Sequence, residues 1–300
     1  SSRDNPSSVV FEEFNLARYA GHPYGYTGKV LEESVPKITR ENVVSFYNKF
    51  FSPQNMIVSV AGDFDKQDII DKFSSITVKP DAQKVDINAL IKKYNTSAIT
   101  SNKLIPVKKD TSTGWLVMGW STAGMVNEKD FAVLNVINSI IGRGMSSRLF
   151  SNLREKQGLA YEVSSAYPSR LDESSFVMYI GTKPQNLELA KNQFLQEISR
   201  IIREPVSEKE LADAKQNIIG KYALSQETGG EKAHVLGWYE VIGKGYKFNY
   251  DYPSLINSVT AQDILNVASK YFSNPNIVSV IGPEKYVEVV EKGYNLESKR

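Results

Sequence analysis

Apolar and polar positions along this chain follow two different periods, and the change of period separates expected strands from expected helices. Gly114–Ser121 is a short, almost wholly apolar run of the kind that forms a buried strand. Ala160–Tyr167 and Ser174–Gly181 flank the turn-rich segment Pro168–Glu173, a spacing typical of an antiparallel hairpin. Phe131–Ile141 is apolar on nearly every face, which predicts a buried helix.

Three further segments follow the helical period. A short helix is expected to begin at Ser146 or Ser147 and to end at Gly158, because glycine is the preferred residue just past a helix end. Ser207 and Glu210 form an expected capping box ahead of a longer helix. The apolar faces of the three helices are Leu149 and Leu153; Leu187, Phe194, Ile198 and Ile201; and Leu211, Ala214, Ile218 and Tyr222.

Strands joined by a hairpin, with helices grouped behind them, indicate an α+β fold rather than a doubly wound parallel sheet. An internal repeat extends this architecture. The segment Thr39–Phe51 followed by Ile57–Gly62 matches Thr260–Phe272 followed by Ile277–Gly282, at offsets of 221 and then 220 positions. Both threonines are expected N-caps, with Asp263 completing the start signal of the second helix. Both Ile-Val-Ser-Val runs are expected strands.

The colinear register favours duplication over chance similarity of two helix–strand units. We therefore expect residues 1–80 to be the later half of a first domain, 81–104 to be a linker, and 105–300 to be a complete second domain. The linker is lysine-rich, with a helical turn expected at Ile87–Tyr94. On this interpretation the first domain is incomplete, so its core face is exposed unless another chain or fragment covers it.

Composition excludes several classes of protein. Apolar residues make up 41% of the chain and charged residues 23%, with a net charge of +2, so neither a nucleic acid nor an anionic membrane surface is indicated as a partner. No apolar run is long enough to span a membrane. There is no cysteine, and His22 and His234 are the only histidines, so the usual paired-histidine zinc site and a cysteine nucleophile are excluded.

The segment Gly142–Tyr161, GRGMSSRLFSNLREKQGLAY, is the most informative stretch of the chain. It lacks the lysine and serine or threonine of a phosphate-binding loop, so its glycines alone indicate only a turn. Taken by themselves, its residues predict a turn, a short helix and the start of a strand. Arg154 would then be a solvated helix residue and Tyr161 an ordinary strand aromatic.

The same segment resembles the C-domain signature of the pitrilysin-type (M16) zinc metallopeptidases, in the branch that contains mitochondrial processing peptidase. Residues 5–62 also resemble the later half of that family's N-domain, through NPSSVVFEE, GHPYG and ITRENVVSFYNKFFSPQNMIVSVAGD in that order. The resemblance covers nearly the whole chain. It implies two homologous α+β domains of antiparallel sheet packed with helices, the processing-peptidase-like metallohydrolase fold, which agrees with the repeat.

The resemblance also implies roles for two residues. In this family an arginine and a tyrosine seven positions apart reach from the C-domain to the zinc site, and they match Arg154 and Tyr161. A zinc-bound water attacks a peptide carbonyl there, and the resulting oxyanion needs preorganised donors. The tyrosine hydroxyl would donate to that oxygen while the guanidinium holds the substrate backbone. The neighbouring glycines and serines are expected to shape the turn.

The zinc motif of the family, H-x-x-E-H with a later glutamate, has no match in this sequence. The corresponding helix of the second copy carries Asn135 and Asn138 but no histidine, so zinc is expected in the intact parent or a partner chain and none on this chain itself. His22, within GHPYG, is expected to be a structural turn residue. His234 is expected to be an ordinary helix or core residue, and Glu12 and Glu13 to be helix-surface residues.

Three functions remain open at this stage. The first is the C-terminal part of a zinc endopeptidase that holds unfolded peptides, by strand addition to a sheet edge in one version. The second is a non-catalytic partner or core subunit that works with a zinc-bearing M16 chain in a homo- or heterodimer. The third is a scaffold without a peptide role. The compartment is open, with a soluble protein of the bacterial cytoplasm or periplasm as the expectation.

Overall fold

The computed structural model describes residues 5–76, 83–86, 89–90, 93–94 and 98–297. Its strands are β1 (Lys103–Lys108), β2 (Gly114–Thr122), β3 (Ala160–Ala166), β4 (Ser174–Thr182) and β5 (Asn276–Gly282). Its helices are α1 (Pro6–Arg18), α2 (Gly28–Ser34), α3 (Arg40–Phe50), α4 (Lys66–Ser74), α6 (Glu128–Ile141), α7 (Leu187–Arg203), α8 (Glu208–Leu224), α9 (Gly229–Val241), α10 (Phe248–Ser258), α11 (Ala261–Phe272) and α12 (Glu284–Glu297). A π-helix, η5 (Phe150–Lys156), lies between α6 and β3.

The chain divides into two units. Unit 1 comprises residues 1–27, 94–219 and 255–300, and unit 2 comprises residues 28–93 and 220–254. Unit 1 contains the five-stranded sheet, in the order β1-β5-β2-β4-β3. Strands β5, β2, β4 and β3 pair antiparallel, whereas β1 and β5 pair parallel, so the sheet is mixed.

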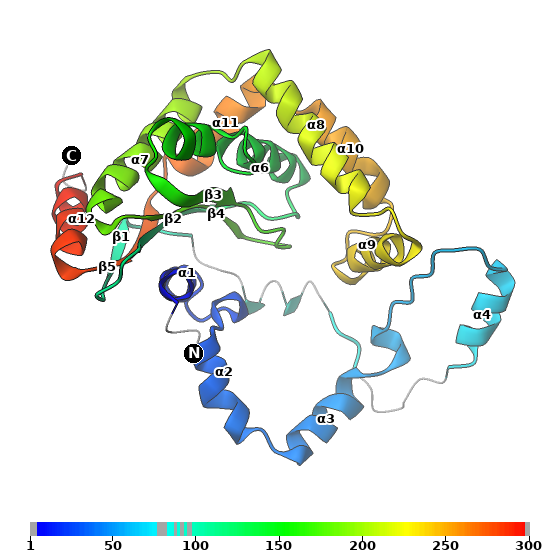
Figure 1. Ribbon diagram of the computed structural model, residues 1–300. Helices are drawn as coiled ribbons and strands as arrows, with labels where there is room; N and C mark the ends of the chain where they lie inside the picture. Colours follow the sequence, from blue (N-terminus) through cyan, green and yellow to red (C-terminus); the bar gives the residue numbers. More distant parts are fainter. Residues whose placement is uncertain (1–4, 77–82, 87–88, 91–92, 95–97, 298–300) are drawn as a thin grey trace. The chain divides into compact units, whose positions relative to one another are not determined.

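Both faces of this sheet are covered within unit 1. Figure 1 shows α6, α7 and α11 along one face and α1 on the opposite face. On the first face the Trp120 ring of β2 meets Phe272 of α11, with ring centroids 5.5 Å apart. On the second face Val10 and Phe14 of α1 join a buried cluster with residues of the strands, namely Val117, Val177, Ile277 and Ile281. The three inner strands β2, β4 and β5 are therefore buried along most of their length, as is usual when both faces of a sheet are covered.

A buried cation fixes the end of α1 to the sheet. The Arg18 side chain has no exposed surface and lies 3.1 Å from the Glu173 carboxylate. Its Nε donates to Ser175 Oγ at 3.0 Å, and its Nη2 donates to the carbonyl of Ser174 at 3.1 Å. The neighbouring Tyr19 hydroxyl also shares a hydrogen bond with Ser175 Oγ. These contacts join the end of α1 to the start of β4.

Within unit 2, α9 and the start of α10 meet through a small polar cluster. The Tyr222 hydroxyl bonds to Asn249 Oδ1 at 2.6 Å and shares a hydrogen bond with the Tyr239 hydroxyl. Burial, with a further contribution from Tyr239, raises the pKa of Tyr222, so this cluster stays neutral at physiological pH.

The expected α+β class is confirmed, and so are most of the local elements. The predicted strand at Gly114–Ser121 is β2, the predicted hairpin is β3–β4, and the buried helix Phe131–Ile141 is α6. Thr39 and Thr260 both cap helices and form capping boxes with Asn42 and Asp263. The sheet differs from the expected antiparallel arrangement only in the parallel pairing of β1 with β5, because the chain reaches β5 last and inserts it between β1 and β2.

The strand expected at Ile57–Gly62 is wrong. This segment has no regular structure, although its counterpart Ile277–Gly282 is the buried strand β5. A strand needs neighbouring strands to satisfy its backbone groups, and β5 has β1 and β2 beside it. No strand pairs with residues 57–62 in the described part of the chain, so the same four-residue pattern stays extended and largely exposed.

The helix before this segment shows the same contrast. In α11, Val267 and Phe272 are 5% and 4% exposed, because they pack on the sheet and on neighbouring helices. Their counterparts in α3 and its C-cap, Phe46 and Phe51, are 57% and 60% exposed. Unit 2 thus carries an apolar helix face that is buried in the equivalent element of unit 1.

The repeat-based domain boundaries stay a prediction, because the two contact units follow packing rather than ancestry. Residues 1–27 belong to unit 1 together with residues 94–219 and 255–300, whereas residues 28–93 lie in unit 2. The helical turn expected at Ile87–Tyr94 lies partly outside the described residues.

Replacing Arg18 should destabilise unit 1 because it removes the buried cation that binds Glu173, Ser175 Oγ and the carbonyl of Ser174. Arg18→Ala is expected to lower the free energy of unfolding by about 2–4 kcal/mol in urea titrations. Arg200→Ala is the matched control, since Arg200 forms an exposed pair with Glu204 one turn away, and it should change stability by less than about 0.5 kcal/mol. Equal effects of the two substitutions would contradict the role given to Arg18.

The start of α11 should make stability depend on acid pH. Hydrogen bonds from Thr260 to the Asp263 carboxylate hold the pKa of Asp263 below its usual value. A lowered folded-state pKa stabilises the fold above the unfolded-state pKa and loses that contribution as pH falls through the folded value. Asp263→Asn should therefore show a smaller drop in melting temperature between pH 7 and pH 2 than the natural chain. Identical pH profiles would contradict this assignment.

Candidate functional site

The two residues expected to contact substrate lie at successive elements of unit 1. Arg154 is exposed on η5, and its guanidinium lies 5.3 Å from the centroid of the Phe150 ring one turn earlier. Tyr161 lies near the start of β3 and is 53% exposed. Neither side chain has a hydrogen-bond or ion-pair partner among the residues that the structure describes. Both side chains are therefore available to an outside group.

The helix that carries Arg154 is wider than the sequence suggested. The N–H of Gln157 donates to the carbonyl of Asn152, five residues back, which is the π-helical pattern. Leu149 and Leu153 are fully buried, as their spacing predicted, and they hold one side of this segment in the core. Single π turns are frequent at functional sites because they shift the side chains that follow.

The turn after η5 ends as predicted at Gly158, whose φ of 58° lies in the left-handed region that favours glycine. The N–H of Leu159 then donates to the carbonyl of Leu153 at 2.8 Å. The helix begins at Arg148, directly after Ser147 as expected, but the Ser147 side chain does not cap it. Ser147 donates its hydroxyl to the carbonyl of Gly144 instead of accepting from a helix N–H, because the preceding segment is a tight turn.

Tyr161 is the extra residue of a β-bulge. Ala160 pairs with Thr182 and Glu162 pairs with Gly181, so no residue of β4 lies opposite Tyr161. The bulge interrupts the alternation of the strand, so Tyr161 and Glu162 are both exposed while Ala160 and Val163 are both buried. Bulges at sheet edges often re-aim a side chain. Here the bulge exposes Tyr161 on the edge strand of the sheet.

An ion pair that sequence reasoning missed braces this region. The Arg148 guanidinium forms two hydrogen bonds to the Glu210 carboxylate, at 2.7 and 2.8 Å, in a bidentate arrangement. The Arg148 side chain is only 10% exposed. Burial lowers the pKa of Arg148, but the hydrogen bonds and charge of Glu210 outweigh it and leave the pKa raised. The pair joins the start of the motif helix to α8.

This pair also corrects the expected capping box at the start of α8. Ser207 Oγ accepts from the N–H of Glu210 at 3.2 Å, as a cap should. The Glu210 carboxylate, however, binds Arg148 rather than the backbone of Ser207. Residues 62 positions apart cannot be paired from local spacing, so only the half of the box that depends on neighbours was predictable.

The two histidines have different surroundings. His22 caps a short 3-10 helix, accepting from the N–H of Tyr24 through Nδ1, and its ring lies 4.4 Å from the Tyr24 ring. Burial, followed by the charges of Arg170 and Arg18, lowers its pKa. The structural role expected of His22 is confirmed. His234 lies exposed on α9.

The described residues contain no group of three or more His, Cys, Asp or Glu side chains that could hold a metal ion. The residues present therefore do not fit a zinc site. Nor does any helix in the described ranges have the length and apolar character needed to cross a membrane. The Arg154 guanidinium can donate hydrogen bonds and positive charge to an oxygen atom, and the Tyr161 hydroxyl can donate a hydrogen bond to it.

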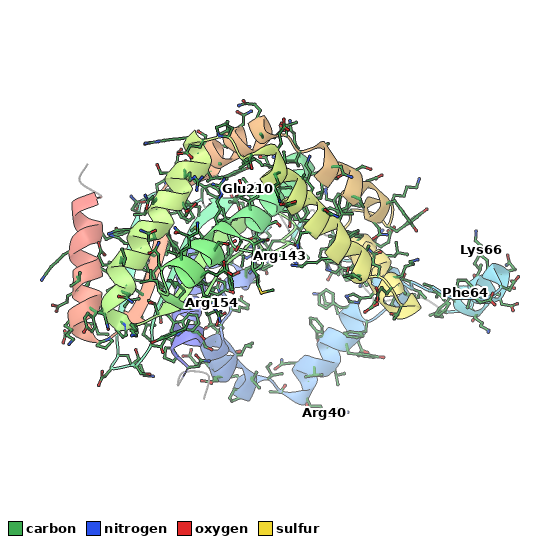
Figure 2. The ribbon with its side chains drawn as sticks, turned by 45° about the horizontal axis from the view of Figure 1, so that its top comes forward. Arg40, Phe64, Lys66, Arg143, Arg154 and Glu210 are labelled. Carbon is green, nitrogen blue, oxygen red and sulfur yellow. The ribbon has the colours of Figure 1, made fainter. Side chains whose placement is uncertain are left out.

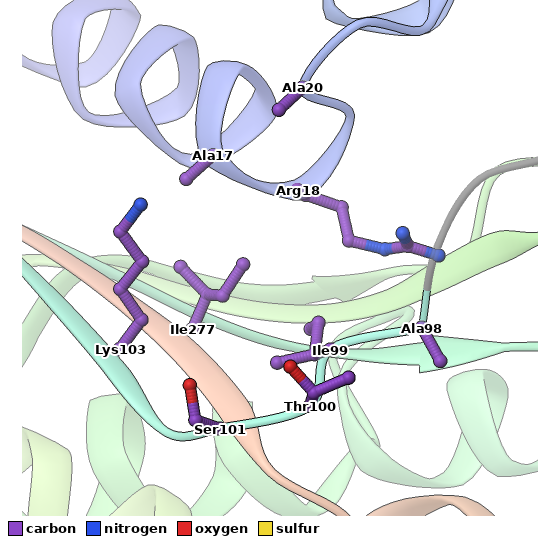
Figure 3. A pocket seen from close by; sticks show the side chains of 9 residues that line it. All are labelled: Ala17, Arg18, Ala20, Ala98, Ile99, Thr100, Ser101, Lys103 and Ile277. Carbon is purple, nitrogen blue, oxygen red and sulfur yellow. The ribbon is translucent and has the colours of Figure 1, made fainter.

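Two of the cavities in the described part of unit 1 are of similar size. The first, of about 270 Å³, lies between the C-terminal end of α1 and the segment that leads into β1. Figure 3 shows Lys103, Thr100 and Ser101 lining it with Arg18 and small apolar residues. Its described lining has neither a carboxylate nor an imidazole, so it offers no acid–base pair. The second, of about 280 Å³, lies beside the Gly142–Tyr161 segment.

Comparison of the sequence with known proteins identifies the family of this chain. Residues 37–218 match the family model described as Peptidase M16 inactive domain. An uncharacterized zinc protease of Rickettsia felis is 31% identical over 287 residues, which are 94% of this chain and 66% of that protein. The uncharacterized zinc protease YmxG of Bacillus subtilis is 25% identical, over 93% of this chain and 66% of that protein. The chain thus spans just under two thirds of the length of these relatives.

Solved structures show the same fold at lower identity. A protease from Helicobacter pylori has a TM-score of 0.83 and 20% identity, covering 94% of this chain and 68% of that one. A chain of Complex III2 from Candida albicans has a TM-score of 0.80 and 15% identity, covering 99% of this chain and 71% of that one. These likenesses confirm the fold that the sequence resemblance implied.

Proposed function

The chain belongs to the M16 peptidase family, and from that premise we propose that it is the substrate-binding part of a zinc metalloendopeptidase that acts on unfolded peptides. The observation that carries this proposal is the exposure of Arg154 and Tyr161. A buried helix face and a bulge hold them at the surface of unit 1, where their polar groups have no partner among the described residues.

In this role the two side chains bind the peptide rather than break it. The Tyr161 hydroxyl donates to the carbonyl oxygen of the bond to be cleaved, where negative charge develops. The Arg154 guanidinium holds a neighbouring backbone carbonyl through its fixed fork of donors. The described residues offer no metal ligands, so the zinc implied by the names of the relatives is supplied by another segment or chain.

The apolar surface of unit 2 supports a requirement for a further polypeptide. Its α3 face carries exposed Val43, Phe46 and Tyr47, whose counterparts in α11 are buried against a sheet and helices. A surface of this kind is stable in water only when it is covered. The cover is either another part of the same protein or a zinc-bearing M16 chain in a homo- or heterodimer.

The sheet offers two edges to an extended peptide, and they differ. Strand β1 carries Pro106 in its middle and Lys103 and Lys108 at its ends, features that discourage strand addition. Strand β3, at the other edge, has neither proline nor lysine and begins beside Tyr161. A peptide that added to the first half of β3 would pass directly beside the bulge.

A non-catalytic partner or core subunit is the second candidate function. Two observations favour it: the matching family model is described as an inactive domain, and a chain of Complex III2 has the same fold. In that role the chain would serve a zinc-bearing subunit without contacting the reacting bond. The two candidates differ in what they require of Arg154 and Tyr161.

Substitution in the zinc-complete assembly separates these roles. Tyr161→Phe and Arg154→Ala should each lower kcat for a fluorogenic peptide by about 10²-fold, because each removes a donor to the charge that develops in the transition state. Lys156→Ala is the control, since Lys156 is an exposed neighbour on the same π-helix. Unchanged kcat in both variants would favour the non-catalytic subunit.

A further inference from the structure

The cavity beside the Gly142–Tyr161 segment has features of a built binding site. It is lined by the end of α6, the turn after it and the first turns of α8, including Ser139, Arg143, Ser146, Ser207, Glu210 and Asp213. At about 280 Å³ it is smaller than the pockets that hold drug-sized molecules, so it fits a single side chain. All of its lining belongs to unit 1.

Among the charged residues that line this cavity, one cation has no anionic partner in the described part of the chain. Glu210 is neutralised by its bidentate pair with Arg148, and Asp213 is neutralised by Lys209 on the same helix. The guanidinium of Arg143 has no carboxylate or hydrogen-bond partner among the described residues. Figure 2 marks Arg143 together with Glu210 and Arg154. The remaining charge therefore favours an anionic group.

The turn that carries Arg143 is held in place on both sides. The N–H of Arg143 donates to the carbonyl of Asn138 at 3.0 Å, and Ser164 Oγ donates to the carbonyl of Gly142 at 2.9 Å. A side chain at Gly142 would collide with β3, since its Cβ would lie 2.1 Å from the nitrogen of Ser165. The backbone at Arg143 is thus held in place, and its exposed side chain extends from this anchored turn.

The anchoring of this turn also sets its distance from the candidate site. Ser164, which binds the turn, follows Tyr161 by three residues along β3, or roughly 10 Å at ~3.3 Å per residue. An extended peptide rises by the same amount per residue. A peptide with its reacting bond beside Tyr161 would therefore bring a side chain about three residues away to Arg143.

We propose that this cavity is a specificity pocket for an acidic side chain, aspartate or glutamate, about three residues from the cleaved bond, with Arg143 as its recognising cation. The inference rests on the proposed peptide-binding function and names its substrate class. A carboxylate fits the fork of the guanidinium in a bidentate manner, and the serine hydroxyls of the lining can donate to it. The terminal carboxylate of a peptide could bind Arg143 in the same way, and the test distinguishes it from a side-chain carboxylate.

The test measures equilibrium binding of fluorescent peptides to the full natural protein by anisotropy, independently of cleavage. The peptides are acetylated and amidated, and a single aspartate is moved along an otherwise neutral sequence whose cleavage site is mapped by mass spectrometry. Aspartate two to four residues from the cleaved bond should tighten binding about fivefold over alanine, the gain expected of a partly exposed ion pair. The gain should fall at high salt.

Variants of the protein identify the cation. Arg143→Glu should abolish the aspartate preference and create a lysine preference at the same peptide position, while Arg143→Lys keeps part of the original preference. Arg203→Glu, the same charge change at an exposed site of α7 outside the pocket, should leave the preference unchanged. The aspartate scan with the natural protein tests the pocket even where a variant fails to fold.

The outcomes separate this proposal from the proposed function. Peptides that are bound and cleaved without any aspartate preference would overturn the pocket alone. A gain that appears only with a free terminal carboxylate would overturn the side-chain assignment. A protein that binds and cleaves no peptide would overturn the proposed function and the pocket with it. A positional preference that reverses with Arg143→Glu would support the pocket.

Discussion

Covering of the second face of the sheet by α1 is the interaction on which the rest of unit 1 depends. Strands with apolar side chains on both faces need a layer on each, and α1 brings Val10 and Phe14 to the face opposite α6, α7 and α11. The helix lies in residues 1–80, the expected first copy of the repeat, so on that prediction one copy completes the core of the other. Arg18, whose side chain has no exposed surface, then joins the helix to the start of β4.

This packing reaches the candidate site through the sheet. Strand β4 is held by α1 at one end and pairs with β3 along its length, and β3 carries the bulge that exposes Tyr161. The ion pair of Arg148 with Glu210 supports the other side of the Gly142–Tyr161 segment. The exposed side chains of Arg154 and Tyr161 therefore lie on backbone whose neighbouring apolar side chains are buried. Rigid support of this kind is what an oxygen-binding site needs, because loosely held donors lose their effect.

Local signals in the sequence predicted most of the fold. The caps at Thr39 and Thr260, the apolar face of α7 and the turn at Gly158 all depend on residues within one or two helical turns. The failures are non-local. The Ile-Val-Ser-Val pattern is a strand in one copy and irregular in the other, because only the second has partner strands, and Glu210 leaves its expected cap for a residue far away in the sequence.

The candidate site shows a different limit. Arg154 and Tyr161 were identified by family resemblance, whereas their own spacing favoured ordinary surface residues. The structural features that expose them are a π turn and a bulge, each of which adds one residue to a regular hydrogen-bond ladder. The bulge shifts the alternation of β3, but a strand of seven residues is too short for the sequence pattern to show where the extra residue lies. The unpaired charge of Arg143 could likewise not be predicted from the sequence, because it depends on the pairing of Glu210 with Arg148 and of Asp213 with Lys209.

The irregular segment at residues 57–62 has a consequence for how the molecule is made. A β-branched run with unpaired backbone groups is a template for pairing with any extended chain, including another copy of itself. A strand that paired with this segment would satisfy its backbone groups and remove the template for self-association. Pairing of this kind would protect the polypeptide most while it folds, when such segments are exposed at the highest risk of aggregation.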